Sequence, residues 1–174
     1  MTLRAKIATL MVSAACLFAS ATPGPRAEGR TAPELVGINQ WLNSAPVSLA
    51  SLRGKVVLVN FWTYACSNCL NALPHVTRLQ ENYKGKGLVI IGVHTPEFPF
   101  ERSTSNVQTA IQRLGITYPV AQDNDFATWK AYRNQYWPAQ YIIDKSGKIV
   151  FSHAGEGQYD TIERTIRDLL DAKS

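Results

Sequence analysis

Apolar residues gather along the chain in two kinds of segment, and their spacing predicts strands and helices in turn. Two continuous apolar runs of strand length, residues 56–62 and 88–93, are typical of strands buried on both faces. Between them, a segment from about 66 to 83 has a broad apolar side and is predicted as a helix. Residues 106–114 repeat apolar positions at the i, i+3, i+4, i+7 spacing of a second helix. The chain therefore contains repeated strand–helix units.

The last third of the chain follows a different order. A short strand is predicted at about 118–121, and two further strand-like runs, 140–143 and 148–151, are joined by a polar hairpin turn. The last helix is expected to start at Asp160, with Glu163 as its capping-box partner. Strand–helix units followed by a hairpin and a closing helix predict an α/β fold, with a mixed central β-sheet flanked by helices on both faces.

Composition and charge add modest limits. The 174 residues are 45% hydrophobic and 18% charged, which is typical of one folded domain and excludes a disordered chain or a coiled coil. The formal net charge is +5. Without Arg4 and Lys6, 16 basic residues remain against 13 acidic ones, a net charge of +3. No cluster of Lys and Arg interleaves with aromatic residues, so we expect no nucleic-acid partner.

The N-terminus has the pattern of an export signal. Two cations in residues 1–6 precede an uncharged apolar run of 13 residues, 7–19, which is too short to cross a bilayer as a helix. Small residues ending at Ala21 then form a cleavage site. We therefore expect a signal peptide over residues 1–21, a flexible leader over 22–33, and one domain over 34–174. A buried N-terminal helix is disfavoured by the Pro- and Gly-rich stretch that follows.

Cys16 leaves a second possibility for the N-terminus, because the residues before it loosely resemble a lipoprotein box. Lipidation of Cys16 would anchor the protein to a membrane. We favour cleavage after Ala21, since Ser13 is not the aliphatic residue that such a box requires. Either route leads to a periplasmic or otherwise extracytoplasmic protein. Disulfides persist in that setting, so the remaining cysteines form either a structural bridge or a redox centre.

Cys66 and Cys69 carry the clearest chemistry in the sequence. The pair follows a buried strand and opens a helix, where unpaired N–H groups and the positive end of the helix dipole stabilise a thiolate. Two cysteines are too few for a thiolate zinc site, and a bridge across so short a loop stabilises little. We expect a redox-active disulfide in which Cys66 attacks and the less exposed Cys69 resolves, with no metal and no cofactor.

The run from Val59 to Cys69, with Pro74 five residues later, resembles the active-site segment of the thioredoxin superfamily. It is most similar to the exported TlpA/ResA branch, and within it to DipZ-type domains attached to CcdA-like membrane electron carriers. The likeness extends from about residue 35 to 170 in the family's order of elements. It implies a thioredoxin fold and a thiol–disulfide oxidoreductase.

The same resemblance assigns roles to individual residues. Asn60 stands where cytosolic thioredoxins have a buried aspartate, and asparagine cannot take a proton. Glu97 matches the glutamate that takes over this role, and as a carboxylate buried beside the pair it would relay the proton of Cys69. The alternative is that Glu97 is a solvated loop residue. Pro138 matches the cis-proline that faces the cysteines, and Trp137 before it would bind substrate through its backbone and an apolar surface.

These features together predict an extracytoplasmic reductant of protein disulfides, acting in cytochrome c maturation or redox homeostasis. The resemblance implies exported disulfide proteins, apocytochrome c among them, as substrates and a CcdA/DsbD-like membrane donor of electrons; we expect a monomer.

Two alternatives stay open at this point. One is a thiol peroxidase of peroxiredoxin type, suggested by the Thr63-x-x-Cys66 element. The other is a copper carrier of the same fold, using both thiolates and a histidine. Three histidines are available, and each is expected to be structural or exposed instead: His75, His94 and His153.

Overall fold

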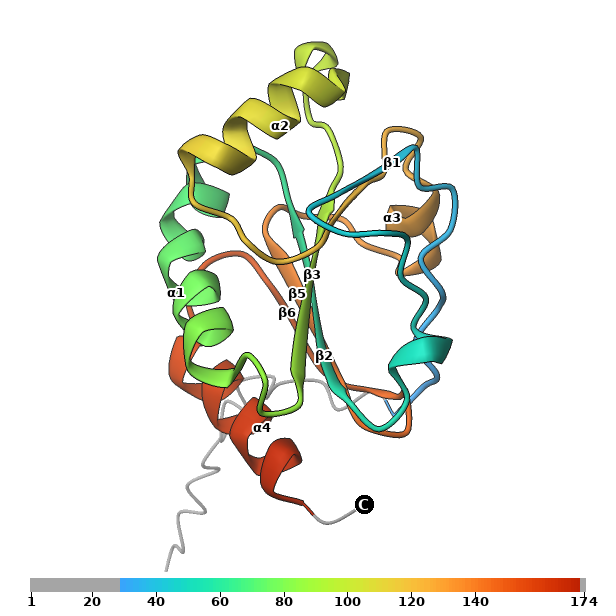
Figure 1. Ribbon diagram of the computed structural model, residues 1–174, viewed down its shortest axis with the longest axis vertical. Coiled ribbons are helices and arrows are strands. Elements are labelled where there is room, and N and C mark those ends of the chain that lie inside the picture. The colour runs from blue at the N-terminus through green and yellow to red at the C-terminus, as the bar shows by residue number, and fades with distance from the viewer. Residues whose placement is uncertain (1–28, 173–174) are drawn as a thin grey trace, which may run out of the picture.

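The computed structural model describes residues 29–172, which form one mixed β-sheet with helices on both faces (Figure 1). This arrangement confirms the architecture expected from the sequence. The expected signal peptide and Cys16 lie outside the described residues. Within them the sheet has six strands in the order β1-β4-β3-β2-β5-β6. Their bounds are β1 (Gln40–Leu42), β2 (Val56–Trp62), β3 (Leu88–His94), β4 (Val120–Gln122), β5 (Ala139–Ile143) and β6 (Ile149–Ala154).

The central strand β2 directs the chain toward the candidate site. Every residue of β2 is buried, and the strand pairs in parallel with β3 and antiparallel with β5. Burial on both faces explains why its sequence is a continuous apolar run without alternation. The loop after Trp62 therefore leaves the middle of the sheet, with a neighbouring strand on each side.

The helices divide between the two faces of the sheet. The buried side chains of α1, α2 and α4 join one apolar cluster with the sheet, and α3 packs on the opposite face with η1 and the segment before β1 (Figure 1). None of the helices in residues 29–172 is long and apolar enough to cross a membrane. The helices are α1 (Ser67–Tyr83), α2 (Thr104–Arg113), α3 (Ala127–Ala131) and α4 (Tyr159–Asp171), with 3-10 helices η1 (Ala50–Leu52) and η2 (Pro99–Arg102).

Two helix starts differ from those expected. α2 begins two residues early because Ser103 caps it, with its hydroxyl accepting a hydrogen bond from the Asn106 N–H at 3.4 Å. α4 begins after Gln158, which has a left-handed backbone (φ 55°) and no side-chain cap. Asp160 therefore lies inside the first turn of α4, and the predicted capping box with Glu163 is wrong.

The contacts of the domain begin before the expected boundary at residue 34. The Ala32 N–H donates to the Gly147 carbonyl at 2.9 Å, and the Ile149 N–H donates to the Arg30 carbonyl at 2.9 Å. These bonds attach the end of the predicted leader, residues 22–33, to the hairpin between β5 and β6.

Candidate active site

Cys66 ends the loop after β2 and caps the first turn of α1. Its backbone is extended, and its Sγ accepts a hydrogen bond from the Cys69 N–H at 3.2 Å. The first N–H groups of a helix have no partner within the helix, and the helix dipole is positive there, so a sulfur anion is stabilised at this position. The structure thus places the cysteine pair at the strand–helix junction that the sequence predicts.

The two sulfur atoms are close together but differ in exposure. The Cys69 thiol donates to the Cys66 Sγ at 2.6 Å, and both cysteines are free. Cys69 is only 5% exposed, whereas Cys66 is partly exposed. Burial is the largest cause, and the hydrogen bond to Cys66 the next largest, of a pKa of the Cys69 thiol that lies well above its ordinary value. Cys69 therefore keeps its proton while Cys66 can be reached from outside.

A fully buried carboxylate, that of Glu101, holds the loop that precedes the cysteine pair. One of its oxygens accepts hydrogen bonds from the Thr63 hydroxyl and from the Ala65 N–H, the latter at 3.0 Å. The other oxygen accepts from the N–H groups of Glu97 and Phe98 at 2.7 and 2.8 Å. Such partners replace the water that a buried charge loses. Glu101 thereby joins the turn before the cysteines to the loop after β3.

The sequence alone does not single out Glu101. Pro99 at the first position of η2 and Glu101 at the third are a helix-start signal, and the Glu101 side chain does accept from the Phe98 N–H at the cap. That signal predicts a local cap only. It gives no indication that the same carboxylate also binds residues 36 and 38 positions earlier in the chain.

His94, the last residue of β3, extends this buried polar cluster. Its Nε2 lies 3.2 Å from the Thr63 Oγ1. Because the Thr63 hydroxyl donates its proton to Glu101, His94 is the donor in this contact and carries its proton on Nε2. Burial lowers the pKa of His94 to about 4, so the ring is neutral at pH 7. The ring also stacks on Tyr64, with centroids 5.6 Å apart.

Glu97 is exposed on the loop after β3. The expectation that it is buried beside the cysteines is therefore wrong, and a solvated loop residue describes its position. Its charge nevertheless lies close enough to add to the raised pKa of Cys69, although burial of Cys69 is the largest cause. Its role as a proton relay stays a prediction.

The loop before β5 contributes the second expected feature. The Trp137–Pro138 peptide bond is cis, and Pro138 is buried. The Trp137 indole N–H donates to the Thr95 carbonyl at 2.9 Å, and the ring lies against Trp129 with centroids 4.2 Å apart. The Trp137 side chain thus ties this loop to the end of β3. Its backbone N–H and C=O, in contrast, have no hydrogen-bond partner anywhere in residues 29–172. Substrate binding by Trp137 and Pro138 stays a prediction.

Asn60 and the other histidines complete the set of residues considered in the sequence. Asn60 is buried in β2, and its side-chain oxygen accepts from the Gln140 amide at 3.3 Å, so an amide pair fills this position. His75 stacks on Tyr159, and His153 contacts the Glu156 carbonyl. Across the described part of the chain, no three His, Cys, Asp or Glu side chains lie together as possible metal ligands. The copper-carrier alternative needs such a set.

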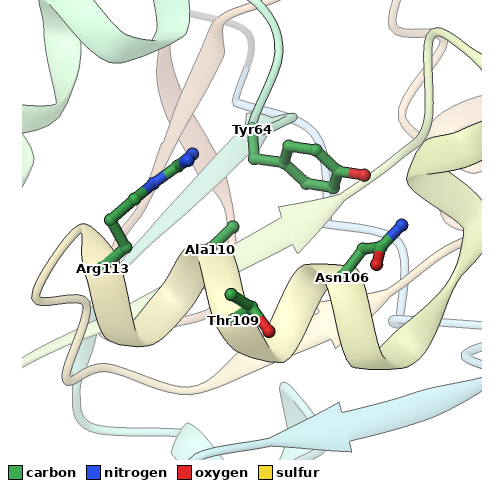
Figure 2. A pocket seen from close by; sticks show the side chains of 5 residues that line it. All are labelled: Tyr64, Asn106, Thr109, Ala110 and Arg113. Carbon is green, nitrogen blue, oxygen red and sulfur yellow. The ribbon is translucent and has the colours of Figure 1, made fainter.

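An open pocket of about 260 Å³ lies beside the loop, between Tyr64 and α2. Figure 2 shows Arg113 and Asn106 rising from α2 on either side of Tyr64. The Tyr64 hydroxyl donates to the Phe100 carbonyl at 3.1 Å, which fixes this wall of the pocket. One wall of the pocket is therefore a residue that precedes the nucleophile Cys66 by two positions in the chain.

Comparisons with known proteins agree with this fold. The model of the AhpC/TSA family matches residues 29–152. Protein DipZ of Mycobacterium tuberculosis is 52% identical over 147 residues, which are 82% of this chain but 21% of DipZ, so the chain spans about a fifth of that relative's length. Thiol-disulfide oxidoreductase YkuV of Bacillus subtilis is 29% identical, covering 79% of this chain and 93% of YkuV. The solution structure of a thioredoxin-like protein in the oxidised form has a TM-score of 0.73 and 30% identity, covering 80% of this chain and 94% of that chain. These similarities confirm the expected thioredoxin fold.

Proposed function

The chain belongs to the AhpC/TSA family of thioredoxin-like proteins, and we propose that it is a thiol–disulfide oxidoreductase that reduces protein disulfides outside the cytosol. The observation that carries this proposal is the pair of free sulfurs 2.6 Å apart, of which only that of Cys66 is partly exposed. The relative YkuV is named a thiol-disulfide oxidoreductase, which supports the same activity.

Reduction begins at Cys66. Its thiolate attacks one sulfur of the substrate disulfide, the S–S bond breaks, and the other substrate sulfur leaves as a thiolate. The product is a mixed disulfide between Cys66 and the substrate. The helix N-terminus at Cys66 supports this step, because its N–H groups and dipole favour the thiolate that attacks.

Cys69 then completes the transfer. It loses its proton, attacks the Cys66 Sγ and releases the second substrate thiolate, leaving a Cys66–Cys69 disulfide. The substrate has gained two electrons, and the cysteine pair has lost them. Because burial raises the pKa of Cys69, this step needs a proton acceptor. We assign that role to Glu97, whose exposed carboxylate is near enough to influence Cys69 and would receive the proton through solvent.

The substrate chain is proposed to lie across the loop before β5. The free N–H and C=O of Trp137 would pair with the backbone of an extended substrate, as an added strand does at a sheet edge. Pro138, buried next to it, keeps its own carbonyl bonded to the Gly155 N–H at 2.8 Å, so the loop is held from beneath.

Sequence features support the proposed location and partners. The signal-peptide pattern of residues 1–21 supports an extracytoplasmic, periplasmic setting. The resemblance to DipZ-type domains supports re-reduction by a CcdA/DsbD-like membrane electron donor. Exported proteins with non-native disulfides, and apocytochrome c in particular, are the proposed substrates.

The reduction potential of the pair tests the direction of electron flow. We expect equilibration in graded thiol buffers to give a value at or below about −250 mV, close to that of thioredoxin, as a dedicated reductant requires. A value above about −180 mV would place the protein with oxidants and isomerases and would contradict a role in reduction.

The thiol-peroxidase alternative rests on Thr63, which stands three residues before Cys66. In the structure the Thr63 hydroxyl forms hydrogen bonds with Glu101 and His94 inside the protein, so it is not directed to a peroxide at Cys66. We expect negligible consumption of peroxide by the reduced protein. Peroxide turnover as fast as the reduction of a peptide disulfide would favour the peroxidase instead.

A further inference from the structure

One residue that lines the pocket beside Tyr64 is a positively charged side chain without a partner. Arg113 is in the last turn of α2, and among residues 29–172 it makes no hydrogen bond or ion pair. Arg102, the last residue of η2 before α2, pairs instead with Asp125 at 3.1 Å. A basic residue in a last helical turn also complements the helix dipole. Arg113 does so here at the edge of a pocket, with its side chain rising toward Tyr64 (Figure 2).

Each of the other polar side chains of the pocket makes a hydrogen bond within the protein. The Asn106 side-chain amide donates to the Phe100 carbonyl at 3.1 Å, and the Thr109 hydroxyl donates to the Ser105 carbonyl at 2.9 Å. No lining residue is acidic. Arg113 is therefore the one charged residue that lines the pocket, and its guanidinium has no partner among residues 29–172. Its planar set of N–H groups matches the two oxygens of a carboxylate.

The walls of the pocket suit an acidic side chain, in which a short apolar chain ends in a carboxylate. The Tyr64 ring forms one side and the Ala110 methyl group forms part of the floor on α2 (Figure 2). Phe100 continues the aromatic wall, with its ring centroid 6.2 Å from that of Tyr64, and it is 55% exposed. Contact with these apolar surfaces would remove water around an ion pair with Arg113 and strengthen it.

We propose that this pocket is a subsite for an acidic side chain of the polypeptide whose disulfide is reduced. The inference rests on the proposed function and adds a preference to it. Tyr64 is two residues from Cys66, and an extended chain advances about 3.3 Å per residue. We therefore place the acidic residue two to four positions from the substrate's own cysteine, for a substrate whose cysteine is bound to Cys66.

Pairs of disulfide-linked peptides test the preference. Members of a pair differ only in Glu or Gln, placed two, three or four residues before or after the cysteine, and the rate constant for their reduction by the reduced protein is measured. For at least one placement we expect the Glu peptide to react up to about fivefold faster at low salt, the range of an exposed ion pair, and this difference to disappear near 0.5 M salt.

Variants of Arg113 separate the pocket from general charge effects. Arg113→Gln is expected to remove the difference between Glu and Gln peptides, and Arg113→Glu is expected to reverse it. Arg164→Gln is at an exposed position of α4, and α4 lies at the opposite end of the molecule from α2 (Figure 1). This variant removes the same charge and is expected to keep the preference. Thermal unfolding of each variant checks that its fold is intact.

Two results would overturn the subsite. Equal rates for Glu and Gln peptides at every placement would do so, as would a preference that persists in Arg113→Gln. Both differ from failure of the proposed function, in which none of the peptides is reduced.

Discussion

The Glu101 carboxylate accepts a hydrogen bond from the Ala65 N–H at 3.0 Å, and Ala65 is the residue that precedes Cys66. Through this bond a buried charge on the loop after β3 fixes the backbone from which the nucleophile projects. The same carboxylate accepts from Thr63, Glu97 and Phe98. Glu101 is thus a positioning residue, which acts on the reaction through the shape of the loop.

Replacing this charge is expected to cost both stability and rate. In Glu101→Gln an NH₂ group faces N–H donors, so at least two buried hydrogen bonds are lost, at a cost of about 3 kcal/mol in the free energy of unfolding. Urea unfolding measures this loss. Alkylation of Cys66 in the folded variant measures the loss of loop geometry, and we expect it to be slower. Glu81→Gln, at an exposed position of α1, is the matched control and should stay within about 0.5 kcal/mol of the parent.

The sign of the effect at Glu97 decides its role. If Glu97 accepts the proton of Cys69, Glu97→Gln slows the decay of the mixed disulfide by about tenfold or more. If Glu97 acts only through its charge, the substitution lowers the pKa of Cys69, since Glu97 now raises it, and the decay becomes faster. We expect the slower decay, measured by rapid mixing of the reduced protein with a peptide disulfide. Unfolding free energy should not change, because the side chain is exposed.

His94 predicts how stability depends on pH. Its pKa is about 4 in the folded protein against 6.5 in the unfolded chain, so as pH falls below 6.5 the unfolded state takes up a proton that the folded state does not. The His94 contribution is therefore complete above pH 6.5 and is lost as pH falls to 4, by about 3 kcal/mol. We expect His94→Gln to lose less stability than the parent between pH 7 and 4 in urea unfolding. Equal losses would show that His94 is not the titrating group.

Trp137 is expected to support the substrate loop through its side chain and to bind substrate through its backbone. Trp137→Phe removes the hydrogen bond to the Thr95 carbonyl, which costs about 1 kcal/mol of unfolding free energy, whereas Trp137→Ala also leaves a cavity and costs about 3 kcal/mol. Because the Trp137 backbone is unchanged, the Phe variant should reduce peptide disulfides at nearly the parent rate. A large loss of rate in the Phe variant relative to the parent would show that the indole itself contacts substrate.

Local patterns in the sequence were sufficient for the central strands, for α1 and for the cysteine pair, because burial on both faces and helical spacing leave direct traces in the order of residues. They were insufficient for the contacts of Glu101 and His94 with Thr63, which is distant from both in the chain and meets them only when β2 and β3 pair. The start of α4 was missed for a different reason. The residue before α4, Gln158, has a left-handed backbone and no capping side chain. Glutamine is not a residue type that indicates such a helix start.

Trapping of the mixed disulfide tests most directly that Cys66 attacks and Cys69 resolves. The reduced variants Cys69→Ala and Cys66→Ala, each also carrying Cys16→Ser, are mixed with a peptide disulfide at pH 7, and the masses of the intact proteins are followed with time. We expect Cys69→Ala to accumulate one peptide bound at Cys66, and Cys66→Ala to stay unmodified, because its remaining thiol, that of Cys69, is buried and keeps its proton. An adduct that forms as fast in Cys66→Ala, or that fails to form in Cys69→Ala, would contradict this assignment.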